Sequence, residues 1–369
     1  TITNSQATIL SVTGTIVATG DCVGGVIGLN GAASLPTVQV SANRIEGVHF
    51  VGGVIGANLP ANEFKFVNAD GAAANAATIG TGRIVADGVA GGIIGYNRVV
   101  NADTLKNALQ NKNGTIAADL QTLLPKFSSG NALDEPALNP GGSAITLTSL
   151  SNQFNIYANA YVGGIIGYNA ADTTLTLENA SNGNQSQAQS YGGLALSPRA
   201  DAANGGAYRL DSGVSLGELD PDHNGYFAGG IIGCTTAKTT LNHCTNYGGV
   251  QHPVAAGGLT GVSDGTITNG RMVNSMGSQQ EGYRYLGGIA GINNGTITNS
   301  APAESSSIRG GLDIGGVAGY NSKSGVITLE NASGNVYGIT ATGGVAGYNL
   351  GIVTARSVTV KVSGTTQTG

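Results

Sequence analysis

Charged side chains are scarce in this chain. Only 10% of its 369 residues are Asp, Glu, Lys or Arg, whereas about 25% is typical of soluble domains. It has 16 Lys and Arg and a net charge of −5, and no basic run offers the phosphate contacts that nucleic-acid binding requires. Tryptophan is absent and aromatic residues make up 5%, so a stacking platform for bases is also missing. We therefore expect no nucleic-acid partner.

Long hydrophobic runs and cysteine motifs are missing too. No apolar stretch approaches the roughly 18 residues of a transmembrane helix, so we expect no membrane-spanning segment in this piece. The three cysteines, Cys22, Cys234 and Cys244, form no Cys-x-x-Cys. Cys234 and Cys244 lie on successive strand-like segments and could touch, which leaves their disulfide state open. Buried thiols that pack as small apolar side chains are the favoured interpretation.

Glycine is abundant, and its pattern is the main signal in the sequence. The 62 glycines show no Gly-X-Y period, which excludes collagen, and 40% hydrophobic residues exclude a disordered Gly-rich linker. Gly-Gly-aliphatic-x-Gly occurs nine times, at spacings of 28, 28, 30, 28 and 28 residues where the array is regular. The copies begin at Gly24, Gly52, Gly91, Gly163, Gly229, Gly257, Gly287, Gly315 and Gly343. A fixed period in this range indicates one supersecondary unit stacked on itself.

Each repeat contains two or three short strands. The third motif position is aliphatic in every copy, and runs such as Gly295-Thr-Ile-Thr-Asn-Ser300 follow as a second strand. We predict an all-β fold, a right-handed parallel β-solenoid of about ten coils of about 28 residues. Thr1–Ser5 repeats Thr296–Ser300, so we expect the chain to be a piece of a longer protein that starts in mid-repeat.

Two stretches interrupt the period and divide the chain. We expect solenoid coils over residues 1–97, an insertion over 98–150, and further coils over 151–369 that carry a loop insertion at 197–226. Apolar spacing predicts two short helices in the first insertion, near residues 103–109 and 116–124, followed by a loop. Insertions on solenoids often lie on the binding side.

Seven of the nine motifs end in asparagine. We predict that these amides tolerate a left-handed backbone or bond the turn, and that they hydrogen-bond to one another as a ladder along the stack. The seven are Asn30, Asn58, Asn97, Asn169, Asn293, Asn321 and Asn349. Tyr96, Tyr168, Tyr320 and Tyr348 precede four of them. We expect these rings to stack, as packing or as a binding surface.

The second insertion carries the candidate chemistry. Asp220-Pro-Asp222-His-Asn224-Gly225 matches the opening of a calcium loop. The twelfth position is Ile231 where an EF-hand needs Glu, so a polar turn is the alternative to a calcium site at Asp220, Asp222 and Asn224. Further acids at Asp201, Asp211 and Glu218 allow either a solvated loop or a polysaccharide lyase or hydrolase with paired carboxylates. No His-Glu-x-x-His or Gly-x-Ser-x-Gly is present.

The units Tyr161-Val-Gly-Gly-Ile-Ile-Gly-Tyr-Asn169 and Leu286-Gly-Gly-Ile-Ala-Gly-Ile-Asn-Asn-Gly-Thr-Ile-Thr-Asn-Ser300 resemble the GLUG repeat. The resemblance covers most of the chain except about 98–150 and 197–226. That repeat occurs in bacterial surface adhesins and in the non-catalytic parts of secreted immunoglobulin-A metallopeptidases. The resemblance implies an exported protein, extracellular or at the bacterial cell surface, whose repeats act as scaffold.

From these observations we expect a non-enzymatic repeat segment of a bacterial surface or secreted protein, acting as an adhesin shaft or ligand-presenting scaffold without a cofactor, apart from the possible calcium. The expected partners are a host glycan, an extracellular-matrix or surface protein, or copies of the chain end to end. The alternatives are a self-assembling fibre subunit, an accessory region of a secreted peptidase, and a polysaccharide-active enzyme.

Overall fold

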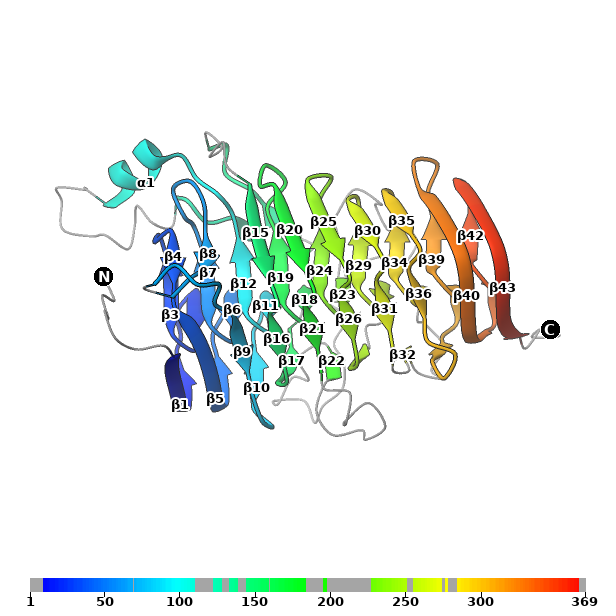
Figure 1. Ribbon diagram of the computed structural model, residues 1–369, viewed down its shortest axis with the longest axis horizontal. Coiled ribbons are helices and arrows are strands. Elements are labelled where there is room, and N and C mark those ends of the chain that lie inside the picture. The colour runs from blue at the N-terminus through cyan, green and yellow to red at the C-terminus, as the bar shows by residue number, and fades with distance from the viewer. Residues whose placement is uncertain are drawn as a thin grey trace.

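The computed structural model describes residues 9–68, 70–109, 122–127, 133–138, 144–158, 160–183, 195–197, 227–250, 255–273, 276–277 and 284–364. Within them the chain winds as a parallel β-solenoid. Successive coils stack along the long axis, and the chain's two ends lie at opposite ends of the molecule (Figure 1). The predicted all-β parallel solenoid is therefore confirmed.

Two nine-stranded parallel sheets contain the Gly-rich motif. Sheet 1 ends each strand on the first glycine of the pair and comprises β2 (Cys22–Gly24), β6 (Phe50–Gly52), β11 (Val89–Gly91), β18 (Tyr161–Gly163), β23 (Phe227–Gly229), β28 (Ala255–Gly257), β33 (Arg284–Gly287), β38 (Leu312–Gly315) and β41 (Thr340–Gly343). Sheet 2 ends at the asparagine position and comprises β3 (Ile27–Asn30), β7 (Ile55–Asn58), β12 (Ile94–Asn97), β19 (Ile166–Asn169), β24 (Ile232–Thr235), β29 (Thr260–Ser263), β34 (Ala290–Asn293), β39 (Ala318–Asn321) and β42 (Ala346–Asn349).

Two further sheets complete the coils. Sheet 3 contains β1 (Ile9–Val17), β5 (Thr37–Glu46), β9 (Ala76–Thr78), β10 (Arg83–Val85), β16 (Ser151–Asn152), β17 (Asn155–Tyr157), β21 (Ser181–Asn182), β22 (Ala195–Ser197), β26 (Thr245–Asn246), β27 (Gly249–Val250), β31 (Arg271–Met272) and β36 (Ala301–Pro302). Sheet 4 contains β15 (Ile145–Thr148), β20 (Leu175–Glu178), β25 (Thr239–Asn242), β30 (Thr266–Thr268), β32 (Met276–Gly277), β35 (Thr296–Thr298), β37 (Ser307–Arg309), β40 (Val326–Gly338) and β43 (Ile352–Gly364).

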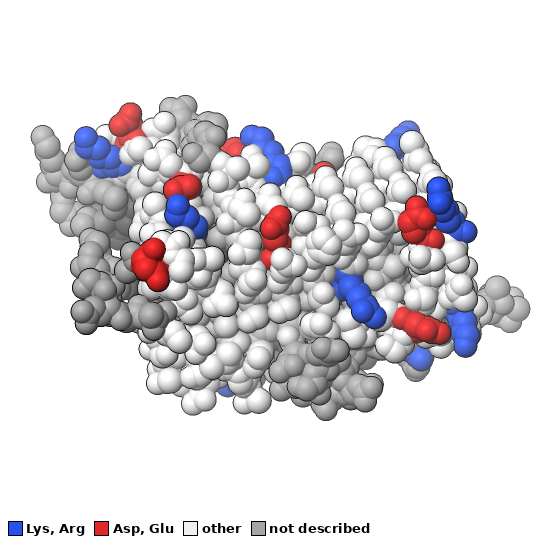
Figure 2. Space-filling view, viewed as in Figure 1, with Lys and Arg blue, Asp and Glu red and all other residues white. Residues whose placement is uncertain are grey.

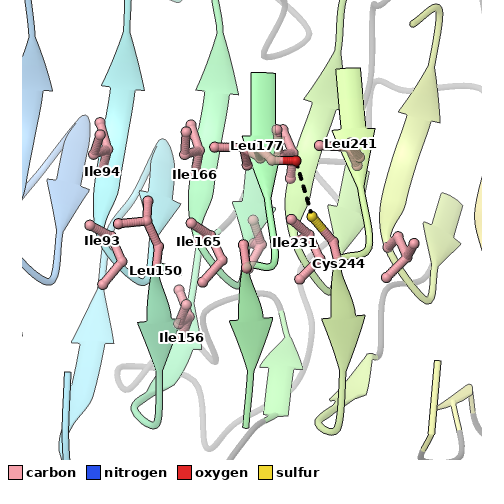
Figure 3. Close-up of a cluster of buried hydrophobic side chains, with 14 of the residues drawn as sticks. Ile93, Ile94, Leu150, Ile156, Ile165, Ile166, Leu177, Ile231, Leu241 and Cys244 are labelled. Atoms are coloured by element: carbon pink, nitrogen blue, oxygen red, sulfur yellow. Dashed lines mark hydrogen bonds between the residues drawn. The ribbon is translucent and has the colours of Figure 1, made fainter. Parts of the chain in front are cut away.

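Register is kept from coil to coil. Gly163 of β18 pairs with Gly91 on one side and Gly229 on the other, and Thr-Ile-Thr of β35 pairs with Thr-Ile-Thr of β30. Equivalent residues therefore form columns along the axis. The aliphatic residues of the motif fill the interior, where Ile93, Ile165 and Ile231 line up opposite Leu177 and Leu241 (Figure 3).

The glycine pair is required because backbones approach closely at this corner. A Cβ on Gly163 would overlap the carbonyl oxygen of Ile166 in the same coil, and a Cβ on Gly164 would overlap the carbonyl oxygen of Gly230 in the next coil. The first glycine of each pair thus allows a tight turn within the coil, and the second allows close contact with the next coil.

The insertion begins with the predicted first helix, α1 (Ala102–Leu109), which lies at one end of the molecule (Figure 1). The second predicted helix falls mostly outside the described residues. The antiparallel pair β13 (Lys126–Phe127) and β14 (Leu133–Asp134) follows, and β4 (Ser34–Leu35) pairs with β8 (Lys65–Phe66) beside the first coils. No described helix is long and apolar enough to cross a membrane.

Candidate functional site: an outer row of side chains and its cover

A second apolar cluster runs along the outside of sheets 1 and 2, separate from the interior core. We call it the outer row. Its members come from the first residue of the sheet 1 strands and the third residue of the sheet 2 strands: Phe50, Val89, Tyr161, Phe227 and Ala255, and Ala57, Tyr96, Tyr168, Cys234, Val262 and Ile292. All of them are buried.

Aromatic rings contact one another within and between coils of the outer row. Tyr96 and Tyr168 stack with centroids 6.2 Å apart and planes at 15°. Tyr161 meets Tyr168 edge to face at 5.1 Å. Further along, Tyr320 and Tyr348 stack at 5.6 Å and 5°. The expected stacking of Tyr96 with Tyr168 and of Tyr320 with Tyr348 is therefore present, although as two separate pairs.

The insertion covers the first part of the outer row. Leu105 of α1 packs over Gly31, and Leu123 and Leu124 are buried in the same cluster, with Leu133 and Leu138 packed against it. Apolar side chains of the insertion thus shield this part of the outer row from water. Removal of apolar surface from water is the dominant favourable contribution to packing of the insertion on the coils.

A polar clasp holds the insertion at two points, its first residue Arg98 and Glu135 in its loop. Arg98, which begins the insertion, donates from Nε and Nη2 to Asp172 Oδ2 at 3.1 and 2.6 Å, and only 4% of its side chain is exposed. Further along the insertion, Glu135 Oε1 accepts from the backbone N–H of Ala171 at 3.3 Å. The Arg98 guanidinium is buried and bonded to Asp172 of the next coil. This contact therefore fixes the start of the inserted segment.

The electrostatics of the clasp are dominated by burial. Burial raises the pKa of the Glu135 carboxyl, and the nearby Asp172 carboxylate raises it further, while Arg98 and hydrogen bonds from Ala171 and Tyr168 act in the opposite direction. The pKa of the Tyr168 hydroxyl is raised well above its usual value by burial. The carboxyl therefore titrates at a higher pH here than in the unfolded chain.

The seven predicted asparagines form hydrogen-bonded runs. Asn30 Nδ2 donates to Asn58 Oδ1 at 2.7 Å, Asn58 to Asn97 at 2.8 Å, and Asn97 to Asn169 at 2.7 Å. A second run joins Asn293, Asn321 and Asn349, both steps at 2.7 Å. Between the runs, Thr235 and Ser263 occupy the asparagine position and their hydroxyls lie 3.4 Å apart.

Left-handed backbone does not occur at the ladder asparagines. All seven ladder asparagines are described and none has a positive φ. Instead, positive φ occurs in a column at the corner after the sheet 4 strands, at Ser149, Asn179, His243, Asn269 and Asn299. Of the two options given for the ladder asparagines, the structure shows the bonded turn: Asn30 Nδ2 donates to the Ala32 carbonyl at 3.1 Å and Asn169 Nδ2 to the Thr173 carbonyl at 3.0 Å. The αL conformation is adopted at the sheet 4 corner, where Asn tolerates it well.

A further ladder was missed from the sequence. Asn152 Nδ2 donates to Asn182 Oδ1 at 2.8 Å, and Asn182 to Asn246 at 2.9 Å, all buried inside sheet 3. The ladder ends at Asn246 because its partner in the next strand is Met272, which has no amide. The signal is Ser-Asn, Ser-Asn and Thr-Asn at β16, β21 and β26, which only alignment of the coils reveals.

The three cysteines are free thiols. Cys234 lies in the outer row and Cys244 in the interior core, so the two do not meet. The Cys244 S–H donates to the Leu177 carbonyl at 3.6 Å (Figure 3), and burial raises its pKa to about 11. Burial also raises the pKa of Cys22 to about 12, with Asp21 adding to the shift. Both shifts favour unreactive thiols.

Asp220, Asp222 and Asn224 lie outside the described residues, so the calcium site stays a prediction; a melting temperature that a chelator leaves unchanged would rule it out. Among the residues that the structure describes, no group of three or more His, Cys, Asp or Glu could hold a metal ion. The face drawn in Figure 2 carries few and scattered charges.

No family model, curated protein or solved structure matches this chain.

Proposed function

We propose that this chain is a repeat segment of a bacterial cell-surface or secreted protein that acts as an adhesin shaft or ligand-presenting scaffold. The observation that carries the proposal is the unbroken coil-to-coil register of sheets 1 and 2, reinforced by buried amide ladders. In-register ladders resist bending and extension because every coil is bonded to both neighbours. The resemblance to GLUG repeats supports an exported location.

The second insertion is the part of such a scaffold that would meet a ligand. We propose that residues 197–226 present the binding surface for a host glycan or matrix protein, since loops carried by a rigid framework commonly provide recognition.

The test is binding of the full chain to immobilised glycans and matrix proteins. We expect saturable binding that is lost when residues 197–226 are replaced by a Gly/Ser linker of equal length. A matched replacement of residues 110–121 should leave binding intact. Absence of binding to every ligand, or turnover of a polysaccharide that is abolished by Asp220→Ala or Asp222→Ala, would reject the proposal.

A second candidate, end-to-end assembly, is favoured by the exposed apolar residues of β43. Ile352 is 61% exposed and Val358 is 42% exposed. Val358 pairs with Ala332 of the preceding coil, which is buried, so the column becomes exposed only at β43. A strand of this kind can accept another coil. Sedimentation should show concentration-dependent association that Val358→Lys abolishes. Thr359→Lys, on the neighbouring position of the same strand, is the control, and a monomer at all concentrations would reject this candidate.

A further inference from the structure

The outer row changes character toward the last coils. In β33, β39 and β42 its positions are taken by Tyr285, Tyr320 and Tyr348, which are half-buried or exposed. Tyr348 is 47% exposed and the neighbouring Leu350 is 44% exposed. We call these residues, with Arg284 and Asp313 beside them, the open end of the outer row. The same columns are fully covered where the insertion lies.

The covered stretch shows how a polypeptide fits this surface. Residues 133–138 cross the coil of Tyr161 and Tyr168. The Tyr161 hydroxyl hydrogen-bonds with the Leu133 backbone, the Ala171 N–H bonds to Glu135, and Leu133 and Leu138 pack on the apolar side chains. The partner of the outer row is therefore an extended segment that offers backbone polar groups to tyrosine hydroxyls and aliphatic side chains to the rings.

The open end repeats the main elements of that arrangement. Tyr320 lies in the column of sheet 2 that also contains Tyr168, with Cys234, Val262 and Ile292 between them. The Tyr285 ring meets the Tyr320 ring edge to face at 5.6 Å. Arg284 lies over the Tyr285 ring at 5.2 Å. A large apolar surface with polar tips is typical of sites that bind other polypeptides.

Backbone strain marks the same place. Tyr285, Asp313 and Ala341 have φ of 48°, 55° and 49°, at equivalent positions of three successive coils. Non-glycine residues adopt this conformation infrequently, and such residues cluster at functional sites. Burial raises the pKa of the Asp313 carboxyl, with Arg284 opposing the shift, so this acid is partly withdrawn from solvent.

We propose that the open end of the outer row binds an extended, aliphatic peptide segment of another polypeptide, in the way that residues 133–138 bind the covered stretch. A glycan fits less well, because Tyr320 and Tyr348 stack face to face at 5° and the shared faces are closed to a sugar ring. The site lies on sheets 1 and 2, not on the insertions, so it acts independently of the ligand presentation proposed above.

The test uses the full chain and a fluorescein-labelled peptide with the sequence of residues 131–138. Fluorescence anisotropy should show saturable binding. Tyr320→Ala should weaken it about five- to tenfold, the loss expected for removal of one aromatic contact. Tyr337→Ala, which removes a tyrosine that packs under Arg309 of β37, is the matched control and should change binding less than twofold. A peptide with both leucines replaced by serine should not bind.

Hydrogen exchange of the unaltered chain provides a second readout that does not depend on how the variants fold. The peptide should slow exchange at residues 312–320 and 340–350. Protection at residues 161–169 would mean that the peptide displaces the insertion and would overturn the proposal. So would a lack of saturation, an equal loss in the Tyr320 and Tyr337 variants, or binding of a glycan without binding of the peptide.

Discussion

Single side chains of this protein must fit two neighbouring coils at once. Every residue of a middle coil has an equivalent above and below it, at the strand spacing of about 4.8 Å. A substitution that changes the size or the hydrogen-bonding capacity of a side chain therefore affects the contacts with both neighbouring coils. This is clearest at the glycine pair and at the asparagine ladder.

At the glycine pair we expect Gly164→Ala to destabilise the protein strongly. The added methyl would overlap the Gly230 carbonyl oxygen and crowd the Asn182 side chain, and overpacking of this kind costs about 1–3 kcal/mol. Urea unfolding should show the loss as a lower midpoint. Gly20→Ala is the matched control, since a Cβ at Gly20 meets nothing within 4 Å. Equal midpoints for the two variants would contradict the close approach of coils.

The break in the asparagine ladder predicts a stabilising change. Asn293 Oδ1 is buried without a hydrogen-bond partner, and the preceding coil offers Ser263 at the same position. Replacing Thr235 and Ser263 together by Asn should connect the two runs and add about 0.5–1.5 kcal/mol for each new bond. The unfolding midpoint of the double variant should rise, whereas Thr359→Asn on exposed β43 should leave it unchanged. A fall would show that these positions lack room for an amide.

At the scale of secondary-structure elements, the insertion packs on the coils and covers part of the outer row. Its helix and its loop strands pack leucines on the outer row, and it is held by polar contacts of Arg98 and Glu135. An element held by one apolar face and two polar contacts can be released without unfolding the coils beneath it.

Release of the cover should depend on pH through Glu135. Its pKa is higher in the folded protein than in the unfolded chain, so the folded state favours the protonated form. The stability it contributes is complete below the ordinary carboxyl pKa and is lost as the pH rises through the raised value. Glu135→Gln keeps an acceptor for Ala171 but cannot ionise. Its melting temperature should match wild type in acid and exceed it at neutral pH. A constant difference across pH would refute this role.

On the scale of the whole molecule, stability is a sum over neighbouring coils. A middle coil has two neighbours and the last described coil has one, which leaves Tyr348, Leu350 and Val358 exposed while their equivalents inside the stack are covered. Repeat arrays of this kind open from their ends, since an end coil has the fewest contacts to lose.

The rate of amide hydrogen exchange should therefore change gradually along the axis. We expect the amides of β19 to exchange most slowly and those of β42 and β43 to exchange fastest, by several orders of magnitude. Mass spectrometry of peptide fragments measures this directly. The gradient should flatten only at concentrations where the chain associates end to end, which links this measurement to the sedimentation test. Uniform exchange in the monomer would contradict opening from the ends.

Much of this architecture follows from the amino-acid sequence. A period of 28 residues with an aliphatic third position leaves few folds other than stacked coils, and Asn at a fixed place in seven copies predicts which side chains meet along the axis. The helix at residues 102–109 follows from its apolar spacing. These features are local or strictly periodic, so each is visible without knowing what lies opposite.

Only the tertiary structure decided which face of each strand points inward, because the motif carries apolar residues and glycine on both faces. It also decided that Cys234 and Cys244 lie in different clusters and that Arg98 meets Asp172, 74 residues away. The cover on the outer row was equally hidden, since it depends on where an irregular insertion folds back. Periodicity specifies contacts between equivalent residues, whereas contacts between unlike elements exist only once the chain has wound.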